Sequence, residues 1–198
     1  MRWKLPRQER ERKAALEAAF KTTLYYAKKN ECGPFPATST LFNIGLYLLI
    51  AERDIQALKI DALTHPDEWT RKLNARIILL TIYEWDADKV SGKALRDALD
   101  QIDPPDDLKA EAIDVLRGLR AVQGRVKKQF TVVRNTAIAH RDPNVLAQFR
   151  AIQDLDVMGV INVAGDFYFE VGRFVSVLTK IMGHNNNLSS FLRQWTSR

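Results

Sequence analysis

The sequence is poor in the residues that cross-link chains or bind metals. It contains one cysteine, Cys32, and three histidines in 198 residues. A single cysteine excludes an intrachain disulfide, and the scattered histidines have no metal-ligand spacing of the usual kind. The sequence therefore predicts no metal site and no cofactor.

Long apolar runs are also missing. The longest apolar block, from Ile44 to Ala51, is far shorter than the roughly 20 residues that a membrane-spanning helix needs. The first twelve residues include five arginines and lysines, but no apolar run follows them, so they do not resemble a secretory signal. We therefore expect a soluble, cytoplasmic protein that has no membrane partner.

The alternation of apolar and polar residues that is typical of half-buried strands is absent. No run of four or more residues shows it, and apolar residues instead recur at intervals of three and four almost throughout the chain. The sequence therefore predicts an all-α fold. Because there is no internal repeat and the length suits one core, a single all-α domain over residues 1–198 is expected.

Turn residues divide this pattern into helices. Pro66, Pro104 and Pro143 are predicted to stand in first helical turns, where proline is tolerated, with Asp103 capping the helix that Pro104 starts. Gly183 is predicted to end a helix in a left-handed cap. The predicted helices cover approximately residues 9–30, 39–63, 66–85, 90–102, 104–139, 143–153, 156–182 and 188–195.

The net charge is +6 and the pI is about 9.5, which favours an anionic partner, although many proteins that bind none share this charge. At about 100° per residue, Arg120, Lys127, Arg134 and Arg141 fall on one stripe of the helix predicted over 104–139 and its end. We call this stripe the basic ridge. Its members Arg120, Lys127 and Arg141, together with the adjacent Lys128, are the candidate RNA-binding residues.

Arg134, Asn135 and His140 interrupt the apolar pattern near the end of the same helix. Arg134 is a permanent cation with a planar fork of donors, and the ordinary pKa of a histidine, about 6.5, permits proton transfer near neutral pH. The 100° spacing places His140 on the apolar face beside the basic ridge. Together, these side chains are suited to binding and transforming a phosphate.

Each of these residues also has a purely structural interpretation. Taken alone, His140 is typical of a half-buried packing residue that is hydrogen-bonded to a carbonyl. Arg134 would then pair with Asp166 or Glu170 on a later helix. Asn135 would satisfy backbone groups near the helix end. The residue types therefore leave both a functional and a structural role open.

The combination resembles the signature of the HEPN superfamily, which is an arginine, four to six residues and a histidine, commonly with a polar residue directly after the arginine. Here Asn135 follows Arg134, and five residues separate Arg134 from His140. The resemblance covers approximately residues 112–182 and is greatest to the abortive-infection and toxin-like branch. It implies a helical bundle of the HEPN type over about 66–183, with additional N-terminal helices, residues 1–65, packed on it.

The resemblance also implies an activity, metal-independent RNA cleavage by a toxin or phage-defence endoribonuclease. The ribose 2′-hydroxyl would attack its own phosphate and leave a 2′,3′-cyclic phosphate. His140 would transfer the proton, Arg134 would bind the phosphate, and Asn135 would orient His140 or a phosphate oxygen. Toxins of this superfamily that are silenced by adenylylation carry a tyrosine at the position of Asp142, so control by that route is not expected.

A homodimer is the further implication, because one histidine is few for a step that needs both an acid and a base. Gly165 and Gly172, seven residues apart, would let a partner helix come close, or else would pack against the long helix of their own chain. An antitoxin or another regulatory partner is also possible. Two alternatives stay open, namely a non-catalytic helical module that binds RNA or a nucleotide, and a structural interaction protein.

The four tryptophans are predicted to be core or packing residues and not a surface for stacking bases, because none lies on the basic ridge. They are Trp3, Trp69, Trp85 and Trp195.

Overall fold

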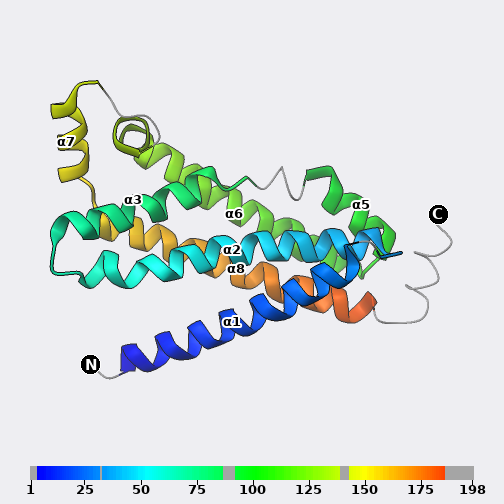
Figure 1. Cartoon of the computed structure of the whole chain (residues 1–198). Helices are drawn as coiled ribbons and strands as arrows, with labels where there is room; N and C mark the ends of the chain where they lie inside the picture. The colour runs from blue at the N-terminus through cyan, green and yellow to red at the C-terminus, as the bar shows by residue number, and fades with distance from the viewer. Residues whose placement is uncertain (1–3, 32, 87–91, 139–142, 186–198) are drawn as a thin grey trace. The chain divides into compact units, whose positions relative to one another are not determined.

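The computed structural model describes residues 4–31, 33–86, 92–138 and 143–185. Every regular element in these ranges is a helix, so the predicted all-α fold class is confirmed (Figure 1). The HEPN type of bundle stays a prediction. His140, Arg141 and Asp142, and the helix predicted over 188–195, lie outside the described residues.

The first two helices agree with the predicted boundaries to within a few residues. Helix α1 (Lys4–Asn30) ends where the sequence predicts, and the Gly33 amide donates to the Asn30 carbonyl at 3.1 Å. Helix α2 (Pro36–Thr64) then begins at Pro36, three residues before the predicted start. Proline suits this first position because its ring fixes a helical φ and no amide hydrogen is lost from the ladder.

Helix α3 (Glu68–Glu84) begins later than the sequence predicts. Asp67, and not Pro66, defines its start, because the Asp67 carboxylate accepts a hydrogen bond from the Thr70 amide at 2.8 Å and one from the Thr70 hydroxyl at 2.6 Å. These two bonds hold the pKa of Asp67 below its ordinary value. The charged carboxylate is thus the form that stabilises the first turn.

The connection between α5 (Gly92–Ile102) and α6 (Asp106–Val133) corrects another prediction. Asp103 does not cap α6, because its amide donates to the Leu99 carbonyl at 2.8 Å and its φ of 51° lies in the left-handed region, so it closes α5. The Pro105 carbonyl instead accepts from the Leu108 and Lys109 amides. Helix α6 therefore starts two residues after the predicted Pro104.

The long helix that the sequence predicts through Ala139 changes its geometry before that point. After Val133 the chain forms a five-residue π-helix, η1 (Arg134–Ile138). A π-helix adds one residue to the turn and is found frequently at functional sites inside longer helices. The backbone is thus distorted at Arg134, the first residue of the proposed motif.

The last two helices lie over the predicted segments but use other caps. Helix α7 (Val145–Gln153) is capped by Asn144, whose side chain accepts from the Ala147 amide at 3.1 Å. Helix α8 (Val157–Asn185) runs through Gly183, and no glycine of the described ranges has a positive φ, so the predicted left-handed cap at Gly183 is wrong. A glycine permits a left-handed cap but does not require one.

The chain divides into two compact units. One unit comprises residues 1–50, 86–115 and 172–198, and the other comprises residues 51–85 and 116–171. Helices α2, α6 and α8 contribute residues to both. The prediction of a single domain with a HEPN-like core over 66–183 stays a prediction.

Each unit has its own apolar interior, made of the alternating three- and four-residue spacings that the sequence shows. The fully buried side chains of the first unit include Leu41, Leu48, Ile102, Phe174 and Ile181. Those of the second include Ile55, Ile78, Ile82, Leu119 and Phe167. These stripes position the polar residues of the same helices at the surface.

Over the described part of the chain, no helix combines the length and the apolar character needed to cross a membrane. Within the same residues, no group of three or more histidine, cysteine, aspartate or glutamate side chains is arranged to hold a metal ion.

Candidate functional site

Arg134 is held by a carboxylate from α3. Its Nη2 and Nε atoms donate to Oε1 of Glu84 at 2.6 and 3.2 Å. The side chain of Arg134 is 22% exposed and that of Glu84 is 51% exposed. The ion pair fixes the guanidinium at the surface of the second unit and leaves one edge of it accessible.

Asn135 supplies the second constraint on Arg134. Nη1 of Arg134 donates to Oδ1 of Asn135 at 3.1 Å. A guanidinium carries five N–H donors, and these contacts use one on Nε, one on Nη1 and one on Nη2. Within the described residues, each terminal nitrogen thus keeps one further N–H. Two such donors form the fork that binds carboxylate or phosphate oxygens in pairs.

The ring of Tyr83 lies close to two cations, Arg134 and Lys127. Cζ of Arg134 is 5.0 Å from the ring centre of Tyr83, and Nζ of Lys127 is 5.8 Å from the same centre. An aromatic face attracts cations, which offsets part of the repulsion between the two charges. Two members of the basic ridge therefore share one support from α3.

The π-helix is also tied to α3 through Arg76. Nη1 of Arg76 donates to the Ala137 carbonyl of η1 at 3.4 Å, while its Cζ lies 5.7 Å from the ring centre of Trp69. Both α3 and α7 contact η1. Carbonyls near the end of a helix accept no hydrogen bond from the helix backbone, and Arg76 donates one to such a carbonyl. The distorted segment is thus supported from two sides.

The remaining described residues predicted to bind RNA lie on the outer surface of α6. Arg120, Lys127 and Lys128 are exposed. They lie outside the apolar face of the helix, on which Val122 and Val126 are buried. Arg120 and Lys127 of the basic ridge are therefore exposed on α6, and their predicted binding of RNA stays a prediction.

The structural partners that the sequence suggests for Arg134 are not the ones it has. Arg134 pairs with Glu84, and Asp166 instead pairs with Arg125 at 2.8 Å. The acidic partner on α3 was not visible from the spacing along α6 and α8.

His140 and Arg141 lie outside the described residues, so the structure does not test their predicted places or roles. The prediction for both used 100° per residue over an unbroken α-helix. That spacing stops applying at Arg134, because η1 has the wider π turn. The angular relation between Arg134 and His140 therefore cannot be taken from straight-helix arithmetic.

Three residues that support the site were missed by the sequence analysis. Tyr83, Glu84 and Arg76 belong to α3, and Glu84 precedes its partner Arg134 by 50 residues. One signal was available. Trp69, Arg76 and Tyr83 are spaced by seven residues and so share one stripe of α3. A stripe of aromatic and basic residues beside a basic helix favours cation–aromatic pairs.

The two described tryptophans both pack against other rings, one in the core and one at the surface. Trp85 is buried and meets Phe167 edge to face. Trp69 is 44% exposed and stacks on Phe149, which is 49% exposed. Its position in the first turn of α3 explains the difference, because the apolar stripe of that helix begins further along. Trp3 and Trp195 lie outside the described residues.

Gly165 and Gly172 do not mediate close packing inside the described chain. Both are exposed, and a Cβ atom built on either would meet no described atom within 4 Å. The large residues beside them, Phe167 and Phe174, are fully buried and carry the packing of α8. The predicted use of these glycines by a partner helix is not tested.

Comparisons of the chain with protein-family models, with curated proteins and with solved structures find no match.

Proposed function

We propose that the protein is a metal-independent endoribonuclease of the toxin or phage-defence kind. Arg134 and His140 are its catalytic residues, and Asn135 supports them. The observation that carries the proposal is the fixed guanidinium of Arg134, which Glu84, Asn135 and Tyr83 hold from three directions at the start of a π-helix. The resemblance to HEPN proteins supplies the reaction.

The geometry suits stabilisation of a charged transition state. A donor that is already oriented needs no reorganisation when charge builds on the phosphate, and removing such a donor typically costs about 100-fold or more in rate. The two remaining N–H groups of Arg134 would bind two phosphate oxygens, and Asn135 keeps the fork in that orientation. Lys127 beside the same ring adds positive charge along the path of the RNA.

The proton transfers are assigned to His140. One imidazole would have to serve both the attacking 2′-hydroxyl and the leaving oxygen, whereas two copies in one cleft divide these tasks. We therefore propose that the active form is a homodimer with two Arg134–His140 pairs in a composite site. Control by an antitoxin or another regulatory partner belongs to the same proposal.

The test compares wild type with His140→Ala and Arg134→Ala in RNA cleavage assays containing EDTA. We expect wild type to cleave, and each variant to lose about 100-fold or more. Arg125→Ala is the matched control, because Arg125 is an exposed arginine on the same helix whose partner is Asp166. Equal cleavage by wild type and His140→Ala, or no cleavage by wild type, would overturn the proposal.

A second candidate function is a non-catalytic module that binds RNA or a nucleotide through the basic ridge. The exposure of Arg120, Lys127 and Lys128 favours it. Such a module binds RNA with an affinity that falls steeply with salt, and the binding survives His140→Ala. If the protein is instead a structural interaction protein, Arg134→Ala lowers stability and leaves RNA affinity unchanged.

A further inference from the structure

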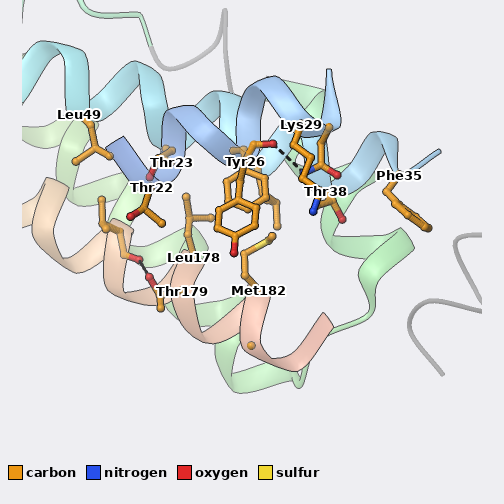
Figure 2. Close-up of a pocket in the computed structure, with 16 residues that line it drawn as sticks. Thr22, Thr23, Tyr26, Lys29, Phe35, Thr38, Leu49, Leu178, Thr179 and Met182 are labelled. Atoms are coloured by element: carbon orange, nitrogen blue, oxygen red, sulfur yellow. Dashed lines mark hydrogen bonds between the residues drawn. The ribbon is translucent and has the colours of Figure 1, made fainter. Parts of the chain in front are cut away.

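A cavity of about 640 Å³ lies in the first unit, between α1, α2 and α8 (Figure 2). Tyr26 of α1 lies in the middle of its lining and faces Leu178 and Met182 of α8. Thr22, Thr23 and Leu49 lie at one end. Lys29, Thr38 and Phe35 lie at the other end. The lysine thus lies at one end of the lining and not at the other.

Close packing beside the cavity fixes the three helices that form it. A Cβ atom on Gly45 of α2 would lie 3.3 Å from Cδ1 of Leu178 and 3.7 Å from Cγ2 of Thr23, so α1 and α8 approach α2 closely at this glycine. The rings of Tyr26 and Phe42 stack with centres 5.3 Å apart and planes inclined by 12°. The cavity wall is therefore built from packed and not from loose side chains.

The lining has the composition of a small-molecule site. Apolar side chains line it together with the polar groups of four threonines, Tyr26, Lys29 and Asn30. Two of these groups already serve their own helices, because Asn30 donates to the Tyr26 carbonyl and the Thr179 hydroxyl donates to the Val175 carbonyl. The residues that line the cavity within the described chain include one lysine, Lys29, and no carboxylate.

This charge pattern selects the class of ligand. A cationic molecule would find no carboxylate among the described lining residues and would be repelled by Lys29, whereas an anionic group placed at Lys29 would be attracted. Away from Lys29, Leu49 and Leu178 together with the methyl groups of Thr22 and Thr23 suit an apolar segment. We propose that the cavity binds a small amphiphile with an apolar body and one anionic head group, the head lying at Lys29. This site is independent of the proposed ribonuclease function.

The size of the cavity suits a medium-chain body, and each buried methylene raises affinity about fourfold. Decanoate is therefore the first probe, and hexanoate, decanol and decyltrimethylammonium are its matched relatives. Calorimetric titration of the full chain should give one site for decanoate, with weaker binding of hexanoate. Decyltrimethylammonium should bind at least about tenfold more weakly than decanoate. Decyl sulfate, with the same chain and another anionic head, should also bind, because the charge and not the carboxylate is recognised.

Two pairs of variants locate the ligand. Lys29→Gln should weaken decanoate binding several-fold, whereas Lys28→Gln, at the neighbouring lysine that does not line the cavity, should not. Gly183→Trp places an indole at the lining, where an added Cβ meets no described atom within 4 Å, and should abolish binding. Gly172→Trp is its control, because that glycine is equally open on the same helix and lies outside the cavity.

Equal binding of decanoate and decyltrimethylammonium would overturn the proposal, as would equal losses in Lys28→Gln and Lys29→Gln. Full binding by Gly183→Trp would place the amphiphile elsewhere and would overturn it too. If Gly183→Trp fails to fold by circular dichroism, the lysine pair decides alone. Binding that requires many molecules per chain would show detergent-like adsorption and would also contradict the single site.

Discussion

The region around Arg134 and the cavity between α1, α2 and α8 differ in how many charged side chains they contain. In this region, cations from α3, α6 and η1 lie over two aromatic rings, and the partly exposed carboxylate of Glu84 pairs with Arg134. The cavity lining is mostly uncharged, and Lys29 is the one charged residue among those of the described chain that line it. Charge is therefore concentrated around Arg134 and nearly absent from the lining of the cavity.

This difference teaches where each region takes its stability. Ion pairs with half-exposed partners contribute little to folding, typically about 0–1 kcal/mol. Buried side chains contribute several times more, because their removal loses transfer free energy and leaves a cavity. We therefore expect substitutions around Arg134 to change the free energy of unfolding little and the activity on RNA strongly. Substitutions in the helices around the cavity should lower the free energy of unfolding and affect that activity less.

The largest expected effect comes from the apolar interior of the first unit. Phe174 is fully buried, so Phe174→Ala should lower the free energy of unfolding by about 3–5 kcal/mol. Urea denaturation followed by circular dichroism measures the loss. Arg134→Ala should lose less than about 1 kcal/mol in the same assay. A loss at Arg134 as large as the one at Phe174 would erase the contrast between the two regions.

A smaller effect is expected where the second unit does bury a charge. Lys72 is 6% exposed, and its Nζ donates to the Gln153 carbonyl at 2.5 Å and pairs with Glu68 at 2.7 Å. Lys72→Met should lower the free energy of unfolding by about 1.5–3 kcal/mol, because a charge-assisted bond between α3 and the end of α7 is lost. Lys128→Met, on the exposed side of α6, is the control and should change stability little.

A still smaller effect is expected from the Tyr83 ring, which contacts Arg134 without adding charge. Tyr83→Leu keeps an apolar side chain but removes the aromatic face, which at exposed sites is worth about 0.5–1 kcal/mol to a cation. RNA affinity, measured by fluorescence anisotropy at fixed salt, should fall about two- to fivefold, while the free energy of unfolding changes little. An unchanged affinity would mean that the ring does not position Arg134 for RNA.

The smallest effect concerns pH and the start of α3. The bonds from Thr70 lower the pKa of Asp67, and Lys72 lowers the pKa of Glu68. Both carboxylates thus bind protons more readily in the unfolded chain, so they stabilise the fold above their ordinary pKa values of 3.8 and 4.5. This stability is lost as the pH falls through the lower, folded values.

Thermal unfolding measured at several pH values below 5 checks the expectation. Asp67→Asn keeps a capping side chain but cannot titrate, so its melting temperature should depend less steeply on pH than that of wild type. An equally steep dependence in both proteins would show that Asp67 does not contribute.

Helix positions were largely predictable, because apolar residues at three- and four-residue spacings define the buried faces. Helix ends were less so. Asp67 and Asn144 cap helices that were expected to start at Pro66 and Pro143, and α6 starts after Pro105 and not at Pro104, since an aspartate and a proline near a helix start permit several registers. The choice among them depends on packing that begins many residues later.

The candidate site was predictable only on the side that α6 provides. The basic residues from Arg120 to Arg134 follow from a seven-residue spacing. The π turn at Arg134 and the support from Glu84 do not, because both depend on contacts between segments that are far apart in the chain. The cavity escaped prediction for the same reason, as its residues belong to three helices.

The most direct test of the account is the chemistry of the RNA ends. Wild-type protein in EDTA is incubated with an RNA oligonucleotide and with the same sequence carrying 2′-deoxyribose, and the products are analysed by mass spectrometry. We predict that wild type leaves 2′,3′-cyclic phosphate ends on the RNA and does not cleave the deoxy substrate. His140→Ala should leave no such ends. Cleavage of the deoxy substrate, or 5′-phosphate ends that persist in His140→Ala, would contradict a reaction carried by Arg134 and His140.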